Sequence, residues 1–258
     1  MQRVLADLHV HTLLSPCADI EMTPHHIMLR AAEYGIGAVA ITDHNASANV
    51  SAAIEAGERY GIKVFPGMEV ESAEEAHILT IFDTIEQLKS WQNIVDMQMN
   101  GMLNNADKFG AQFVVNADDE FIYEEKRLLL APLKLTAEQI VQQVSSLGGL
   151  IIAAHIDRPA YSIVKQLGFI EPDFGFAATE ISAVGWKRNI QSCLQRVSGF
   201  LPFVTNSDAH NMYDFLSGPK NLLTLQELTV NEIALALTNG GMRSVLPGQF
   251  SDFYKEKE

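Results

Sequence analysis

The chain has 258 residues, of which 47% are hydrophobic, so it can bury one large core or two small ones. Its 32 acidic and 18 basic residues give a formal net charge of −14, which argues against nonspecific binding to a nucleic-acid backbone. Two cysteines are too few for a disulfide framework, and no apolar stretch approaches the ~18 residues that cross a bilayer. We therefore expect a cytoplasmic protein with no membrane partner.

Short β-rich runs alternate with helical patterns along most of the chain, which predicts βαβ units and a mainly parallel sheet. In chain order we expect strand 4–11, helix 24–34, strand 37–42, helix 48–60, strand 63–65 followed by a turn at Pro66-Gly67, and strand 77–82. The second half continues with helix 136–147, strand 150–154, helix 160–167, strand 178–181, helix 187–197, strand 203–206 and helix 230–239. About seven strands favour an α/β fold, a distorted (β/α)7 TIM-like barrel.

The alternation breaks between residues 83 and 135, where a long helical pattern at 85–109 precedes an acidic, irregular stretch. We interpret residues 83–135 as a helical insertion that caps the active site, within a single domain that spans residues 1–258. The charged tail 252–258 is expected to be solvated.

Six of the eight histidines fall at or just after the ends of expected strands: His9, His11, His44, His77, His155 and His210. Because the carboxyl ends of parallel strands meet on one rim of an α/β barrel, these imidazoles become neighbours, together with Asp43, Glu69 and Asp208. A lone histidine at a strand end is usually only hydrogen-bonded, but so many around one cavity compete for hydrogen bonds unless a cation is present. Imidazole and carboxylate ligands predict a zinc, manganese or iron centre.

Six segments resemble, in order, the motifs of the PHP (polymerase and histidinol phosphatase) family. They are Asp7-Leu8-His9-Val10-His11-Thr12, Ile41-Thr42-Asp43-His44-Asn45, Gly67-Met68-Glu69-Val70, His77, Ala154-His155 and Asn206-Ser207-Asp208-Ala209-His210. The resemblance covers about residues 3–210, and the ordered set is highly specific. It implies the PHP fold, a distorted seven-stranded barrel that holds two or three divalent metal ions (Zn, Mn or Fe) at its C-terminal rim.

The resemblance also implies a ligand set for each metal. The three sets are His9, His11, Glu69 and Asp208; then Glu69 as a bridge with His77 and His155; and finally His44 with His210.

The chain departs from the commonest family pattern just after its HxH motif, where many members place the last ligand of the third metal. Here the chain reads Ser15-Pro16-Cys17-Ala18-Asp19, so Cys17 and Asp19 are both candidates. Asp19 suits a harder ion such as manganese, whereas a Cys17 thiolate favours zinc. The alternative for Cys17 is a small, buried apolar residue with no role in the chemistry.

Divalent ions ~3.5–4 Å apart lower the pKa of a bridging water and neutralise charge on a phosphoryl group. We expect a metal-bridging hydroxide to attack the substrate, with Glu69, His155, Asp208 and Asp43 as the catalytic residues. Asp43 is expected to orient a ligand histidine through a hydrogen bond.

Three basic residues are candidates for substrate binding. Arg158 follows His155 by three residues, so its planar guanidinium is expected to clamp a phosphate at the same rim. Lys187 and Arg188 are a second choice, because such residues more often begin a solvated helix face.

The acidic balance favours a small phosphomonoester or nucleotide as the phosphorylated substrate, and no long nucleic acid is expected. Three alternatives are a phosphodiesterase or exonuclease on short oligonucleotides, an amidohydrolase-type C–N hydrolase, and a noncatalytic metal-stabilised module that serves a partner. Glu69 disfavours the amidohydrolase, which commonly has a lysine at the bridging position. A nearly complete motif set disfavours the noncatalytic module. The sequence leaves the oligomeric state open.

Overall fold

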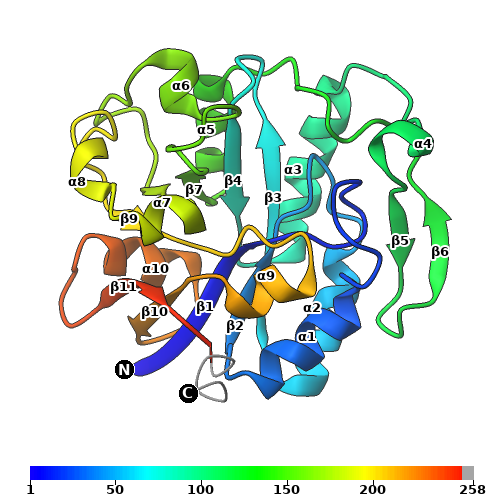
Figure 1. The fold of residues 1–258 in the computed structure, drawn as a ribbon, viewed down its shortest axis with the longest axis horizontal. Helices are drawn as coiled ribbons and strands as arrows, with labels where there is room; N and C mark the ends of the chain where they lie inside the picture. The colour runs from blue at the N-terminus through cyan, green and yellow to red at the C-terminus, as the bar shows by residue number, and fades with distance from the viewer. Residues whose placement is uncertain (252–258) are drawn as a thin grey trace.

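Strand β1, Gln2–Val10, lies between β10 and β2 in a sheet whose strands come from both halves of the chain (Figure 1). The structure is a computed structural model that describes residues 1–251. The charged tail at 252–258, which we expect to be solvated, lies outside the described residues. Within residues 1–251 the main sheet has nine strands in the order β11-β10-β1-β2-β3-β4-β7-β8-β9.

The sheet mixes parallel and antiparallel pairs. Strand β1 is parallel to β2 but antiparallel to β10; β3, β4 and β7 pair antiparallel; and β2-β3, β7-β8 and β8-β9 are parallel pairs. The remaining strands are β2 (Ala38–Ile41), β3 (Lys63–Glu71), β4 (His77–Ile81), β7 (Leu150–Ala153), β8 (Ala178–Glu180), β9 (Phe203–Val204), β10 (Lys220–Leu225) and β11 (Ser244–Gln249).

The segment after β9 returns to the end of β1 and nearly closes the barrel. Val10 forms an isolated parallel bridge with Ala209, and the amide of His11 donates to the carbonyl of Ala209 at 3.1 Å. This confirms the predicted distorted α/β barrel, although its sheet is more mixed than the mainly parallel one that we expected.

Helices begin where the sequence supplies caps. Thr23 directly precedes Pro24, and its side chain accepts a hydrogen bond from the amide of His26. Thr84 and Thr136 each form a capping box with a glutamine three residues later. The helices are α1 (Pro24–Glu33), α2 (Val50–Tyr60), α3 (Ile85–Gln98), α4 (Ala106–Phe109), α5 (Ala137–Ser146), α6 (Ile163–Leu167), α7 (Ala183–Lys187), α8 (Gln191–Leu194), α9 (Met212–Ser217) and α10 (Val230–Leu237).

Two apolar clusters hold the barrel together. The larger cluster joins one set of strand residues, such as Val39, to buried positions of α1, α2, α3 and α5, including Trp91 of α3. The smaller cluster joins other strand residues, such as Leu8 and Phe65, to α10. Burial of this apolar surface fixes the strand ends that carry the polar residues described below.

The expected third strand and turn form one continuous strand. Strand β3 runs from Lys63 to Glu71 through Pro66, which is the last residue of β3 paired with β2. Proline has no amide to donate to the ladder, but the carbonyl of Pro66 accepts from the amide of Phe82 at 2.7 Å. Gly67 follows with its Cα so close to the carbonyl of Ile41 that a Cβ would lie 3.0 Å from that oxygen.

Two other expectations about single elements were wrong, and two strands were missed. The predicted helix 187–197 is replaced by α7 and α8, because Ser182 caps a helix four residues earlier and Asn189, at φ +53°, interrupts it. The predicted helix 85–109 ends at Gln98, and β10 and β11 were not predicted.

Residues 83–135 contain both core and peripheral structure. Helix α3 buries Leu88, Trp91 and Val95, whereas β5 (Phe113–Val115) and β6 (Phe121–Glu124) form a separate two-stranded hairpin at the edge of the molecule (Figure 1). That this segment caps the active site, and that the chain is a single domain, stay predictions. Among the described residues, no helix is long and apolar enough to cross a bilayer. The cytoplasmic location stays a prediction.

Candidate active site

The two histidines of the HxH motif place their imidazoles together at the end of β1. Their Nε2 atoms lie 3.2 Å apart, and both side chains are fully buried. Burial would lower the pKa of His9, but the carboxylates of Asp208, Glu180 and Glu69 raise it well above its ordinary value. Burial lowers the pKa of His11, and His210 and His44 lower it further.

Glu69 lies at the centre of the site. Its Oε1 atom is 3.0 Å from Nδ1 of His77 and 3.2 Å from Nε2 of His155, while its Oε2 atom is 3.0 Å from Nδ1 of His44. An isolated bridge between His44 and Glu69 holds their backbones side by side. Burial would raise the pKa of Glu69, but the imidazoles, with His77 and His9 foremost, hold it well below its usual range.

Asp208 approaches the same imidazoles from the loop after β9. Its Oδ1 atom is 3.2 Å from Nε2 of His9, and its Oδ2 atom is 2.5 Å from Nη2 of Arg158. Asp208 and His155 both have left-handed backbones, with φ of +50° and +27°. Strain of this kind in residues other than glycine is held at functional sites, where it aims a side chain.

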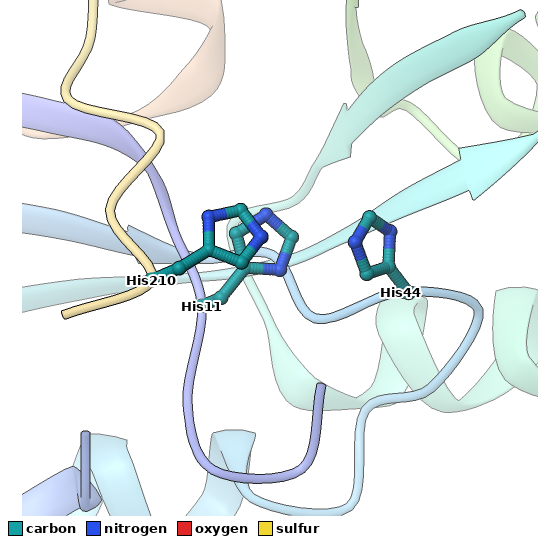
Figure 2. A group of neighbouring side chains, drawn as sticks. All are labelled: His11, His44 and His210. Atoms are coloured by element: carbon teal, nitrogen blue, oxygen red, sulfur yellow. The ribbon is translucent and has the colours of Figure 1, made fainter. Parts of the chain in front are cut away.

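A third group of imidazoles gathers His11, His44 and His210 from three separate segments (Figure 2). The ring of His11 lies 4.2 Å from that of His210 and 4.5 Å from that of His44, between ring centroids. Cys17 is exposed and lines a cavity that His44 and His210 also line. Burial would raise the pKa of its thiol, but hydrogen bonds with His210 and His44 lower it to about 6. The side chain of Asp19 is exposed and does not line this cavity.

The donor atoms fit divalent cations. Among residues 1–251, three sets have ligand atoms within 4.8 Å of one another, and the buried Nδ1 of His155 has no hydrogen-bond partner there. Imidazole nitrogen and carboxylate oxygen are the ligands that zinc, manganese and iron accept. The sets are His9, His11 and Asp208; His44, Glu69 and His77; and His11, His44 and His210. They differ from the sets that the resemblance implies, because His44 lies with Glu69 and His77 as well as with His210.

Two carboxylates behind these imidazoles fix their orientation. The carboxylate of Asp43 accepts from the Ser15 hydroxyl at 2.7 Å, and that hydroxyl lies 3.0 Å from Nδ1 of His11. Asp43 therefore reaches the imidazole of His11 through Ser15. Glu180 lies 3.0 Å from Nδ1 of His9 and also accepts from the His155 amide at 3.0 Å.

Sequence analysis missed Glu180 and Tyr161. Glu180 ends an expected strand, as the histidines do, so its position carried the signal. Tyr161, at φ +58°, stacks its ring 4.6 Å from that of His77 and lines the cavity, but no motif marks it.

The imidazoles and Glu69 open onto a cavity of about 250 Å³, which we call the metal cavity. Arg158 lies on its edge, as expected, and also lines a second cavity with Lys187 and Arg188. Of residues 83–135, Leu130 lines the metal cavity.

The chain is similar to several proteins of known activity. It is 37% identical over 81 residues to phosphoribosyl 1,2-cyclic phosphate 1,2-diphosphodiesterase of Eggerthella lenta, and the alignment covers 30% of each chain. It is 39% identical over 80 residues to the 5′-3′ exoribonuclease Rnm of Salmonella typhimurium, covering 30% of this chain and 26% of that protein. The matched segment thus spans less than a third of either relative.

Among solved structures, the lesion-specific endonuclease Q of Pyrococcus furiosus matches with a TM-score of 0.68 and 22% identity, over 95% of this chain and 58% of that chain. A structure of endonuclease Q in complex with a 27-mer duplex substrate matches with a TM-score of 0.67 and 21% identity, over 94% and 58% of the two chains. At this identity the likeness shows a shared fold.

These relatives contradict our expectation that the substrate is small and that long nucleic acid is excluded, since one is an exoribonuclease and another holds a DNA duplex. The expectation was wrong because a net charge of −14 describes the whole chain. The field at an active site depends on its own cations and on nearby basic residues such as Arg158.

A family model described as the PHP domain matches residues 7–167, which is more than half of the chain. The match includes His9, His11, His44, Glu69 and His77, and it ends beyond His155. The chain therefore belongs to the PHP domain family.

Proposed function

We propose that this chain is a metal-dependent phosphodiesterase that cleaves phosphodiester bonds in a nucleic-acid strand. The observation that carries the proposal is the position of Glu69, whose two carboxylate oxygens meet the imidazoles of His77, His155 and His44 within 3.2 Å. Arg158 lies on the edge of the same cavity, ready for an anionic substrate. The relatives support the diester class, because their names describe a phosphodiesterase, an exoribonuclease and an endonuclease.

The cofactor in this proposal is a group of two or three divalent cations. His9, His11 and Asp208 would hold one, Glu69 with His77, His155 and His44 a second, and His44 with His210 a third. When bound, these cations supply an activated water as the nucleophile and neutralise charge on the phosphoryl group. Cys17 is the better candidate for the last ligand of the third cation, because it lines the metal cavity and Asp19 does not.

The side chains around the cations have two roles: they bind the substrate phosphate and they position the histidines. Arg158 is paired with Asp208 through Nη2, so its remaining guanidinium N–H groups are available to a nonbridging phosphate oxygen. Asp43 acts through Ser15 on His11, and Glu180 acts directly on His9. Both are positioning residues, since neither lines the metal cavity.

The test compares ester classes after loading the protein with Mn²⁺ or Zn²⁺. Bis(p-nitrophenyl) phosphate and a labelled single-stranded oligonucleotide should be hydrolysed, with p-nitrophenyl phosphate hydrolysed more slowly. Glu69→Gln should lose all measurable turnover while keeping its cooperative thermal transition, whereas His26→Asn, on α1 away from the site, should keep full activity. Full activity in the folded Glu69→Gln variant, or hydrolysis of the monoester alone, would refute the proposal.

A further inference from the structure

A second cavity of about 380 Å³ adjoins the metal cavity, and we call it the side cavity. The two cavities share Arg158 and Asp208, so they are neighbours across one ion pair. An extended anionic substrate with one phosphate at the metal cavity therefore has a path past Arg158 into the side cavity.

The side cavity presents two basic side chains without partners. Lys187 is the last residue of α7 and Arg188 is its C-cap, and both are exposed. Neither side chain forms an ion pair or hydrogen bond with another residue of the described part of the chain. Asp157 fixes the start of α7, because its oxygens accept from the amide and the hydroxyl of Ser182 at 2.7 and 2.6 Å. Lys187 and Arg188 thus lie at the end of a helix whose start is held in place by Asp157.

The carboxylates that line this cavity, in contrast, all have partners. The carboxylate of Asp157 accepts hydrogen bonds from Ser182, and that of Asp208 forms an ion pair with Arg158. One oxygen of Asp214 accepts from the Asn211 side chain at 2.8 Å. Three acidic and three basic residues line the cavity, and within the described residues Lys187 and Arg188 are the two charged side chains among them that have no hydrogen-bond or ion-pair partner. The cavity is therefore suited to an anion.

A buried hydroxyl points to the same conclusion. Ser207 lines the side cavity and is 7% exposed, and its Oγ atom has no hydrogen-bond partner among the residues that the structure describes. Buried hydroxyls are almost always paired, so an unpaired one at a cavity wall indicates a missing partner. An oxygen acceptor of the bound anion would supply it.

We infer that the side cavity binds the phosphate next to the one that is cleaved, through Lys187, Arg188 and the Ser207 hydroxyl. The inference rests on the proposed phosphodiesterase function and names its substrate class more closely. The substrate is a strand with at least two consecutive phosphates, and Arg158 lies between their two sites. A single nucleotide ester fills the metal cavity alone.

The test uses two substrates that differ in the second phosphate. One is the p-nitrophenyl ester of thymidine 5′-monophosphate, which has a single phosphate, and the other is a six-residue oligothymidylate. In the K187A/R188A double variant, the KM for the oligonucleotide should rise about tenfold or more, as expected for loss of charge-assisted contacts. The kcat for the oligonucleotide and both constants for the ester should stay within about twofold. The salt dependence of kcat/KM should become shallower for the oligonucleotide, by roughly 0.7 in logarithmic slope for one lost phosphate contact.

A matched control removes the same charge elsewhere. Arg3 and Lys89 are exposed residues that line neither cavity, so R3A/K89A should behave as the unmodified protein on both substrates. An equal loss on both substrates in K187A/R188A would place these residues at the cleaved phosphate and overturn the inference. Unchanged kinetics on the oligonucleotide, with normal ester hydrolysis, would overturn it and leave the phosphodiesterase proposal intact. If the unmodified protein hydrolyses neither substrate, the proposed function fails and the inference fails with it.

Discussion

The carboxylate of Glu180 lies directly behind the imidazole of His9, with Oε2 3.0 Å from Nδ1. Both side chains are buried, and burial would raise the pKa of Glu180 were it not held down by His9. In a neutral His9, a carboxylate in this position keeps the remaining proton on Nδ1, which would leave the lone pair of Nε2 for a cation.

Replacing Glu180 by glutamine should weaken metal binding without touching a ligand. We expect the affinity for Zn²⁺ or Mn²⁺ to fall about 10- to 100-fold, because a neutral amide holds the imidazole less firmly. Titration calorimetry on the chelator-treated protein measures this. Glu58→Gln, an exposed change on α2, serves as the control and should bind as the unmodified protein does. Equal affinities of Glu180→Gln and the control would show that Glu180 does not position His9.

Cys17 should react as a thiolate near neutral pH when metal is absent. Because its pKa is lowered to about 6, its alkylation rate should rise as the pH is raised through about 6 and level off above that. Peptide mapping by mass spectrometry separates Cys17 from Cys193, the internal reference. Saturating Zn²⁺ should protect Cys17 if it is a ligand. A rate for Cys17 that zinc leaves unchanged, together with reduced zinc binding in Asp19→Asn, would instead assign Asp19 as the ligand.

Metal uptake should release protons and tighten as the pH rises. Burial would lower the pKa values of His9 and His44, but carboxylates raise that of His9 and Glu69 with Cys17 raises that of His44, both well above the ordinary value. Both imidazoles therefore carry a second proton in the metal-free protein around pH 6.5. A cation must displace these protons, and raising the pH removes the competition. Calorimetry in buffers of different ionisation enthalpy counts the protons released. Affinity that is independent of pH between about 6 and 8 would contradict this account.

Lys220 should be essential to stability although it lies outside both cavities. Its Nζ atom is fully buried, 3.1 Å from Oδ2 of Asp7, and it donates to the carbonyls of Phe215 and Gly218. Lys220→Met leaves the Asp7 charge buried without its cation, so the free energy of unfolding should fall by about 3–5 kcal/mol. Urea denaturation measures the change.

Two further variants complete the Lys220 test. The exposed change Lys89→Met should alter stability by less than about 0.5 kcal/mol. Lys220→Met combined with Asp7→Asn should recover part of the loss, because the unpaired charge is gone. A single Lys220→Met variant as stable as the Lys89→Met control would show that the buried pair contributes little.

The residues of the site were predictable because their spacing follows strand geometry. His9 and His11 are two residues apart on a strand, so they share a face, and their motif comes just before a loop. Glu69 was recognised as well, although the strand that carries it was not: Pro66-Gly67 has the composition of a turn, and pairing to β2 and β4 overrode that local signal.

Other features depend on contacts that no local pattern contains. Strand β10 pairs with β1 across more than 200 residues, and its short apolar run reads equally well as part of a helix. Helix α7 begins at a serine cap that is itself held by Asp157, a contact made only in the folded chain. For the same reason the sequence marked Lys187 and Arg188 as basic residues but did not show that they share a cavity with Arg158.

Strand β3 carries Glu69 within a paired ladder, opposite Leu79 of β4. The distance from this carboxylate to each imidazole is therefore inherited from sheet register, and a slip of one residue would turn Glu69 to the opposite face. Loops on the rim are free to lengthen or change sequence without disturbing that spacing. The barrel thus separates the sheet, whose register must stay constant for the proposed hydrolysis, from the rim loops, which can diversify to fit different nucleic-acid substrates.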